Sequence, residues 1–256
     1  MASANFRFKQ FTVWHDRCAM KVGTDGVLLG AWCPLDYYPT HDSTYRILDI
    51  GTGSGLIALM LAQRLNDLEQ EAKGERREVW IDAIDIEESA VEQAADNFRL
   101  SPWAEILHAH LSTLQAWKGT TPESQGYDLI VSNPPYFQDS LKNPNAQRAT
   151  ARHTDTLSYA DLMAHATRLL NKNGILALIL PIEAENEIRT LATKNGLYPT
   201  HITHVYPKPN KPAKRLLIAF EHKKSSEEIH TDTFFIESEC APRSIEYQAL
   251  THDFYL

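Results

Sequence analysis

The chain has 256 residues, of which 43% are hydrophobic and 23% charged, and it carries a formal net charge of -8. This composition excludes a disordered chain, and the acidic balance excludes a protein whose whole surface binds polyanions, so a nucleic-acid function requires a local basic patch. Because three widely spaced cysteines (Cys18, Cys33 and Cys240) form no metal or disulfide pattern, and we find no signal peptide or bilayer-length apolar run, we expect a cytoplasmic protein without membrane association or bound metal.

From Tyr45 onward, short β-rich apolar runs alternate with helical patterns. Strands that alternate with helices predict a parallel sheet with helices on both faces. The expected strands are 45–50, 79–84, 105–109, 127–131 and 174–180, and the expected helices are 54–66, 87–100, 158–170 and 183–194. After Gly196 the pattern changes, because 197–205 and 216–220 are separated only by the Pro- and Lys-rich segment 206–215. We interpret these runs as an antiparallel pair that closes the sheet with a long exposed turn.

A glycine-rich loop, Asp49-Ile-Gly-Thr-Gly-Ser-Gly55, follows the first of these strands and opens a helix. Glycines permit positive φ and close approach of a ligand, and a helix N-terminus favours negative charge. Leu56 occupies the third glycine position of a dinucleotide fingerprint, which argues against NAD. The spacing resembles the first motif of class I methyltransferases, in which this loop holds S-adenosyl-L-methionine. We therefore predict cofactor contacts from Asp49, Gly51, Thr52, Gly53 and Gly55; the alternative is an ordinary strand-to-helix turn.

Asp85 and Ile86 end the second strand of the alternating region. A carboxylate at this position can accept hydrogen bonds from both ribose hydroxyls of a nucleotide. Ile86 would then lie against the adenine ring. The alternative for Asp85 is a helix cap for the segment that opens at Glu87.

The sequence Asn133-Pro134-Pro135-Tyr136 follows the fourth strand. The prolines remove two N–H donors and leave carbonyl acceptors, and Asn133 adds a side-chain carbonyl. One N–H of an exocyclic amine can be donated to Asn133 and the other to the Pro134 carbonyl, while Tyr136 offers a face on which a base can stack. The alternative is a simple turn. This motif resembles that of amino-methyltransferases acting on adenine N6, cytosine N4 or glutamine N5.

Several blocks along nearly the whole chain closely resemble the bacterial valine-tRNA adenine-37 N6-methyltransferases. They are 8–11, 16–32, 49–55, 101–103, 132–136 and 254–256. The resemblance implies a Rossmann-like class I methyltransferase fold with a seven-stranded, mostly parallel sheet, an antiparallel last hairpin and helices on both faces. It implies one domain over residues 1–256, with an N-terminal extension, 1–44, over the cofactor site. It also implies methylation of N6 of the adenine next to the anticodon of valine tRNA.

The resemblance also implies roles for three threonine and aspartate positions. In related enzymes the segment matching Thr24 and Asp25 folds over the cofactor; the alternative is that these residues cap the helix 26–32. Where the family usually carries an acidic residue that accepts from the cofactor's adenine amine, this chain has Thr113. A hydroxyl accepts more weakly than a carboxylate, so we expect somewhat looser cofactor binding.

Local basic clusters are the expected contacts to the anticodon arm of the tRNA. One cluster lies in the turn 206–215, a second follows the Asn-Pro-Pro-Tyr motif, and a third lies near the N-terminus. The residues are Lys208, Lys211, Lys214 and Arg215; Lys142, Arg148, Arg152 and His153; and Arg7, Lys9, Arg17 and Lys21. The alternative for any one of them is solvated surface. We expect no obligate protein partner.

Three other functions are compatible with parts of the pattern. A glutamine N5-methyltransferase acting on a translation factor usually carries a helical N-terminal domain, for which the fifty residues before the glycine loop leave little room. An NAD-dependent oxidoreductase has no use for Asn133 to Tyr136. A non-catalytic RNA-binding protein on a methyltransferase scaffold has no reason to keep that motif intact.

Overall fold

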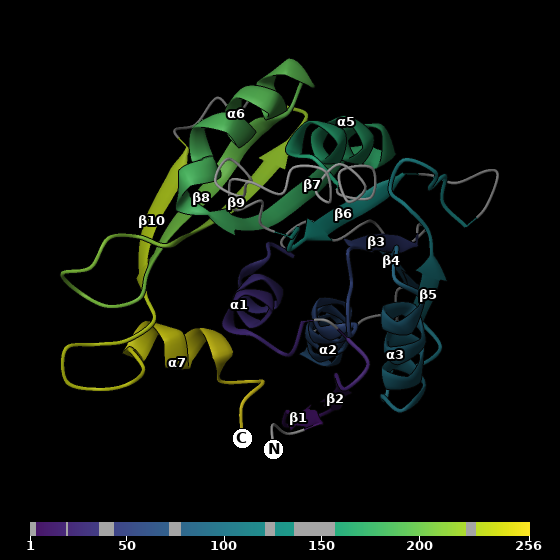
Figure 1. Ribbon diagram of the computed structural model, residues 1–256, viewed down its shortest axis with the longest axis horizontal. Helices are drawn as coiled ribbons and strands as arrows, with labels where there is room; N and C mark the ends of the chain where they lie inside the picture. The colour runs from purple at the N-terminus through teal and green to yellow at the C-terminus, as the bar shows by residue number, and fades with distance from the viewer. Residues whose placement is uncertain are drawn as a thin grey trace, which may run out of the picture.

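The computed structural model describes residues 4–18, 20–35, 44–71, 78–120, 126–135, 157–223 and 229–256. The strands are β1 (Asn5–Arg7), β2 (Thr12–Trp14), β3 (Tyr45–Ile50), β4 (Val79–Asp85), β5 (Leu107–Leu111), β6 (Tyr127–Ser132), β7 (Leu170–Pro181), β8 (Tyr198–Tyr206), β9 (Arg215–Glu221) and β10 (His230–Phe235). The helices are α1 (Thr24–Trp32), α2 (Leu56–Glu71), α3 (Glu88–Arg99), α5 (Tyr159–Leu169), the 3-10 turn η2 (Ile182–Ala184), α6 (Glu185–Lys194) and α7 (Ile245–Thr251). Figure 1 shows α5 and α6 on one face of the central sheet and α1, α2 and α3 on the other.

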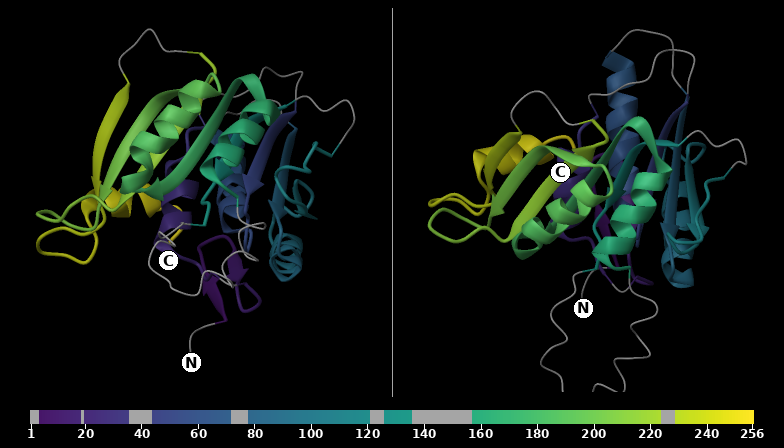
Figure 2. Two further views of the ribbon diagram at one scale, coloured as in Figure 1. Left: turned by 45° about the horizontal axis from the view of Figure 1, so that its top comes forward. Right: turned by 90° about the horizontal axis from the view of Figure 1, so that it is seen from above.

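The main sheet has the strand order β10-β8-β9-β7-β6-β3-β4-β5. Its neighbours pair in parallel except for β9, which runs antiparallel to both β7 and β8. The predicted alternating α/β fold with an antiparallel last hairpin is confirmed. The sheet is eight-stranded rather than seven-stranded because β10 pairs in parallel with β8 at the edge (Figure 2).

Four elements were not expected from the sequence. β10 is an edge strand whose residues are exposed or half-buried, so it carries no apolar run that would mark it as a strand. The strands of the β1–β2 hairpin are only three residues long, and α7 has seven residues. Segments this short carry little periodic signal, and their formation depends on packing rather than on intrinsic propensity.

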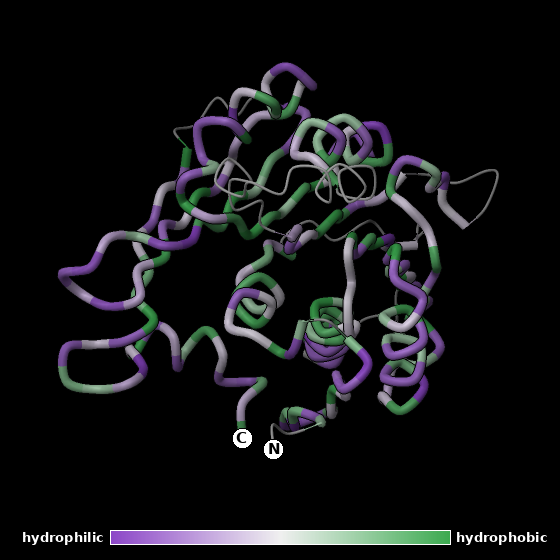
Figure 3. Tube along the Cα trace, viewed as in Figure 1, coloured by the Kyte–Doolittle hydropathy of each residue, from purple (hydrophilic) through white to green (hydrophobic). Residues whose placement is uncertain are grey.

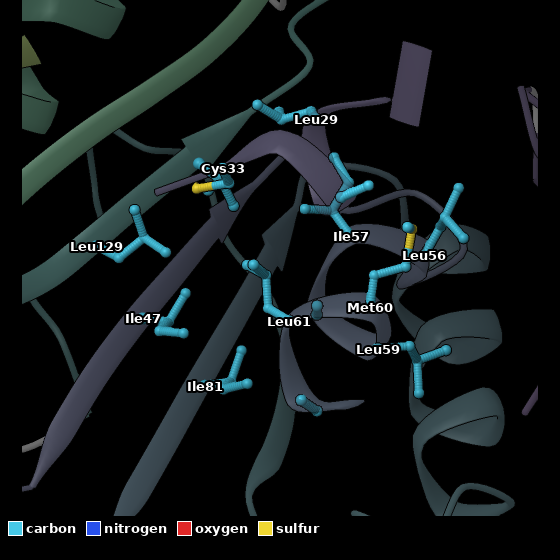
Figure 4. Packing of buried hydrophobic residues seen from close by; sticks show 14 of the residues in the cluster. Leu29, Cys33, Ile47, Leu56, Ile57, Leu59, Met60, Leu61, Ile81 and Leu129 are labelled. Atoms are coloured by element: carbon cyan, nitrogen blue, oxygen red, sulfur yellow. The ribbon is translucent and has the colours of Figure 1, made fainter. Parts of the chain in front are cut away.

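Two hydrophobic layers hold the helices to the sheet. Because side chains alternate along a strand, Ile47 and Leu129 contribute to the layer under α1 and α2, whereas Leu48 and Ile130 contribute to the layer under α5 and α6. The central strands are drawn largely in the hydrophobic colour in Figure 3. Figure 4 shows Ile47 and Ile81 of the strands near Leu61 of α2. Among the described helices, none combines the length and apolar character needed to cross a bilayer.

Helix α1 is a core element that packs closely against α2. A Cβ added at Gly30 would lie 2.8 Å from the sulfur of Met60, and one at Gly26 would lie 3.0 Å from Leu56. Glycine at these positions, one turn apart, therefore permits the close approach of the two helices. Leu56 begins α2 directly after the glycine loop, so its contact with Gly26 places α1 next to that loop.

Candidate active site

Three polar segments leave the carboxyl ends of neighbouring strands at one level of the sheet. Ile50 of β3 pairs with Ile84 of β4 on one side and with Ser132 of β6 on the other. The glycine loop therefore begins between Asp85 and Asn133, which are the next residues along those two strands. The chain reverses its strand order at β3, the position where ligands bind in open α/β sheets. The structure thus brings together the three motifs singled out from the sequence.

The glycines of the loop have two different functions. Gly51, Gly53 and Gly55 have φ angles of 71°, 56° and 81°, a region that L side chains rarely adopt. A Cβ at Gly51 or Gly53 would meet nothing within 4 Å, so both positions leave open space beside the backbone. A Cβ at Gly55 would lie 2.5 Å from the ring of Phe98. Gly55 therefore permits the packing of α3 against the loop, a role that was not expected from the sequence.

Buried hydrogen bonds fix the position of the glycine loop. The Thr52 hydroxyl donates to the Asp49 carboxylate over 2.6 Å, and the Thr52 amide donates to the Ile84 carbonyl over 3.0 Å. The Ser132 hydroxyl donates to the Ile50 carbonyl over 2.9 Å, which ties the end of β6 to the start of the loop. The start of the Asn133-Pro134-Pro135 segment and the glycine loop are therefore held in a fixed mutual orientation.

Asp49 is a fully buried carboxyl group directly beneath the loop. Burial raises its pKa to about 7, and the hydrogen bond from Thr52 opposes that rise. Its Oδ1 atom is buried without a hydrogen-bond partner. A hydrogen bond from the Ala58 backbone also lowers this pKa, and the contact of Asp49 with the cofactor stays a prediction.

The raised pKa of Asp49 predicts a pH-dependent stability that the Asp49→Asn variant lacks. The folded protein takes up a proton at this carboxyl up to a pH of about 7, whereas the unfolded chain releases it near the ordinary value of 3.8. Relative to Asp49→Asn, the native free energy of unfolding should therefore fall by a few kcal/mol as the pH rises through this window and then stay level. Urea unfolding of both proteins from about pH 4 to 8 measures this difference. A pH-independent difference would contradict the assignment.

Asp85 accepts hydrogen bonds from two backbone amides. Its Oδ2 accepts from the Gly53 amide over 2.9 Å, and its Oδ1 accepts from the Glu87 amide over 3.0 Å, just before α3. The carboxylate therefore orients the glycine loop and the residue before α3, but it does not cap that helix, whose N-cap is Glu87 without a side-chain cap hydrogen bond. A carboxylate has about four lone-pair sites, so two remain for ribose hydroxyls, and that contact stays a prediction. Ile86 is 48% exposed beside it, which suits a face for an aromatic ring.

Asn133, Pro134 and Pro135 follow β6 without a break. Pro134 is buried, Asn133 is half-buried, and Pro135 is exposed. The segment thus leaves the sheet at the carboxyl end of β6, next to the glycine loop that follows β3. Tyr136 falls outside the described residues.

Thr113 lies in the turn after β5, with its side chain exposed. Its hydroxyl accepts from the Ala116 amide over 3.2 Å, so it closes this turn. The preceding Ser112 amide donates to the Asp85 carbonyl over 3.0 Å, which places the turn next to the end of β4. The predicted contact from Thr113 to the cofactor's adenine is not tested by these hydrogen bonds and stays a prediction.

Thr24 and Asp25 do not cap a helix, so the capping alternative is wrong. α1 begins at Thr24, and Gly23 is its N-cap, without a side-chain cap hydrogen bond. The Asp25 carboxylate instead accepts from Nε of Arg215 over 2.8 Å, and both side chains are partly buried. Arg215 is the first residue of β9 rather than part of an exposed turn. Its expected place in an exposed turn is therefore wrong, and its contact with RNA stays a prediction.

Asn97 of α3 has a role that was not expected from the sequence. Its side-chain amide donates over 2.8 Å to the Ser54 carbonyl of the glycine loop and over 2.8 Å to the Trp14 carbonyl of β2, and its oxygen accepts from the Trp14 amide over 3.0 Å. Asn97 therefore fastens the N-terminal hairpin to the loop. The sequence held one signal of this role, because Gln93 and Asn97 place two polar side chains on the apolar face of α3.

The basic turn between β8 and β9 lies on the same side of the molecule as the glycine loop, where the parallel strands have their carboxyl ends. β8 is parallel to β3 and its neighbours, so its carboxyl end points toward that side. Lys208, Lys211 and Lys214 are exposed there. By contrast, Arg17 of the N-terminal cluster pairs with Asp96 and with Glu92, so its charge is partly neutralised. The second predicted cluster, with Lys142, Arg148, Arg152 and His153, lies outside the described residues.

The comparisons with known proteins agree on a methyltransferase. A family model described as Eco57I restriction-modification methylase matches residues 39–193. A protein of Bacteroides fragilis is 44% identical over 256 residues, covering 100% of this chain and 99% of the relative. One from Flavobacterium psychrophilum is 44% identical over 251 residues, covering 98% and 99%. Both carry the name tRNA1(Val) (adenine(37)-N6)-methyltransferase.

Solved structures share the fold at low sequence identity. A predicted O-methyltransferase from Agrobacterium tumefaciens aligns with a TM-score of 0.63 and 17% identity, covering 90% of this chain and 96% of that one. The methyltransferase subunit of a type I restriction-modification system from Streptococcus thermophilus aligns with a TM-score of 0.58 and 18% identity, covering 98% and 52%. These likenesses establish the class I methyltransferase fold.

Proposed function

The chain belongs to the family of tRNA1(Val) (adenine(37)-N6)-methyltransferases, and on that premise we propose that it methylates N6 of adenine 37 in valine tRNA. The methyl donor is S-adenosyl-L-methionine. The observation that carries the proposal is the placement of Asn133 and Asp85 on either side of the glycine loop. The product is N6-methyladenosine next to the anticodon, so the enzyme acts in tRNA modification, and we place it in the cytoplasm.

The residues at the carboxyl ends of β3 and β4 fit S-adenosyl-L-methionine. The open space beside Gly51 and Gly53 admits a ligand against the backbone, and Asp49 lies buried beneath that loop. Asp85 would hold the ribose and Ile86 the adenine. When bound, the cofactor supplies an electrophilic methyl group on a sulfonium.

The protein's own part of the reaction is to orient the target amine. The Asn133 side-chain oxygen accepts one N6–H, and the Pro134 carbonyl accepts the other. These two bonds draw the nitrogen lone pair out of conjugation with the ring, and they strengthen as the nitrogen becomes tetrahedral. The proton that N6 loses stays hydrogen-bonded at one of these carbonyls until it passes to water. Tyr136 would stack on the adenine.

A methylation assay tests the proposed substrate. Radiolabelled S-adenosyl-L-methionine is incubated with a valine tRNA transcript, the same transcript carrying guanine at position 37, a translation factor, or no substrate. We expect label only in the first transcript, recovered as N6-methyladenosine. Label in the translation factor would instead indicate glutamine N5 methylation, and label in the guanine-37 transcript would exclude adenine 37 as the target.

The N-terminal region packs into the catalytic domain. The described part of residues 1–44 forms the β1–β2 hairpin and α1. α1 is buried against α2, and the hairpin is fastened to α3 by Asn97. These elements therefore complete the core of the catalytic domain. We propose that this extension shields the cofactor.

The three lysines of the turn between β8 and β9 are expected to contact tRNA phosphates. Replacing Lys208, Lys211 and Lys214 with alanine should weaken the binding of all tRNAs about equally, because phosphate contacts carry no sequence information. The log–log slope of affinity against salt should become shallower by about 0.7–0.9 for each phosphate that is no longer neutralised. Binding titrations at several salt concentrations measure both effects.

The chain offers a matched control for this triple variant. Lys172, Lys194 and Lys223 are also exposed. They lie at the start of β7, the end of α6 and after β9, on the opposite side of the molecule, where the parallel strands have their amino ends. Their replacement removes the same charge and should leave the salt slope unchanged. Equal slopes for both triple variants would contradict a specific role of the turn.

A further inference from the structure

Two histidines and an aspartate converge at the outer edge of the sheet, apart from the active site. In the parallel pair of β8 and β10, His230 lies opposite His201, and Asp232 lies opposite Thr203. Nε2 of His201 lies 2.9 Å from Oδ2 of Asp232, and Nε2 of His230 lies 2.8 Å from the same oxygen. The three candidate ligand atoms all lie within 4.8 Å of one another.

This geometry is close to that of a zinc site. With bonds of about 2.0–2.2 Å to histidine nitrogen and carboxylate oxygen, a tetrahedral zinc ion separates its ligand atoms by roughly 3.3 Å. The observed spacing between each histidine nitrogen and the Asp232 oxygen would have to widen by only about 0.5 Å. Two imidazoles and one carboxylate are ligands that suit zinc among the divalent cations. We propose that His201, His230 and Asp232 bind a zinc ion, with water in the fourth position.

His201 is held in position before any ion arrives. The ring of Trp32, at the end of α1, lies against the His201 ring with centroids 4.8 Å apart. The Trp32 indole N–H donates to the Thr203 hydroxyl over 2.9 Å, and that hydroxyl lies 3.5 Å from Nε2 of His201. The packing of Trp32 therefore restrains the His201 ring, whereas the Thr203 hydroxyl faces the proposed ligand atom itself and would give up that contact to the ion.

A zinc ion at this place would link strand β10 to strand β8. β10 is bonded to the sheet only through β8, and its other side is open within the described part of the chain. The strand leads to α7, where the Ser244 hydroxyl donates to the Phe235 carbonyl over 2.5 Å. A metal joining β8 to β10 would therefore stabilise the C-terminal segment, without taking part in methyl transfer. The spacing of the cysteines predicts no metal site, whereas these histidines are brought together only by the pairing of β8 with β10.

Zinc titration of the tag-free, chelator-treated full-length chain tests the site. We expect calorimetry to show one zinc ion per chain, and zinc to raise the melting temperature. His230→Ala and Asp232→Asn should each weaken binding by at least about tenfold and abolish the melting shift. His252→Ala is the matched control, because His252 is also paired with a carboxylate, 3.1 Å from Asp253, but belongs to no such cluster among the described residues.

Two outcomes would overturn the proposal. The first is native protein that binds no zinc, which would leave two simple histidine–aspartate pairs. The second is zinc binding that His230→Ala and His252→Ala reduce equally, which would mean nonspecific surface binding. His230 has 67% of its side chain exposed, so its replacement keeps the fold intact even if Asp232→Asn does not fold.

Discussion

Replacing Asn133 with alanine is expected to lower kcat by about 10²–10³-fold while S-adenosyl-L-methionine binds with nearly native affinity. The variant removes an acceptor whose hydrogen bond strengthens as N6 becomes tetrahedral, so the effect appears in the transition state rather than in cofactor binding. Asn133 follows directly after Ser132, whose hydroxyl holds the end of β6 to the Ile50 carbonyl, so the rest of the site should keep its geometry.

Single-turnover methylation and cofactor calorimetry separate the two possible effects of this change. Asn133→Asp is the matched control, because a carboxylate keeps an acceptor at the same position and should retain more activity than alanine. An unchanged methylation rate in Asn133→Ala, combined with weakened cofactor binding, would contradict the assignment of Asn133 to the target amine.

Replacing Asp85 with alanine is expected to weaken S-adenosyl-L-methionine binding by about a hundredfold or more. Two hydrogen bonds from ribose hydroxyls to a carboxylate contribute about 1.5–3 kcal/mol each, and every 1.4 kcal/mol corresponds to about tenfold in affinity. The carboxylate also accepts from the Gly53 amide, so its removal should loosen the cofactor loop in addition. At saturating cofactor, the variant should recover a large part of its turnover.

A pure helix cap elsewhere in the chain provides the control for Asp85. Ser158 caps α5, which covers the face of the sheet opposite to α2, by accepting from the Asp161 amide (Figure 1). Ser158→Ala should lower the free energy of unfolding by about 0.5–2 kcal/mol and leave cofactor affinity unchanged. If Asp85→Ala behaves in the same way in calorimetry and urea unfolding, then Asp85 only holds the glycine loop and the start of α3 in position.

The order of the elements and the place of the chemical motifs could be predicted from the amino-acid sequence. The strand expected at 45–50 is observed as Tyr45–Ile50, because a run of buried apolar residues bounded by a glycine turn is a local signal. The glycine loop, Asp85 and Asn133 could be placed at one edge because parallel strands bring their carboxyl ends together. The resemblance over nearly the whole chain added the substrate, which no residue pattern alone would have indicated.

Which side chains meet across long stretches of the chain follows only from the folded arrangement. Arg215 was expected on an exposed turn, but it pairs with Asp25, 190 residues away. Asn97 reaches both Trp14 and Ser54, and His230 lies beside His201 only because β10 adds to the edge of the sheet. The physical reason is the same in each case. A polar residue's type and spacing indicate that it needs a partner, but strand order and register determine which partner lies within hydrogen-bond distance.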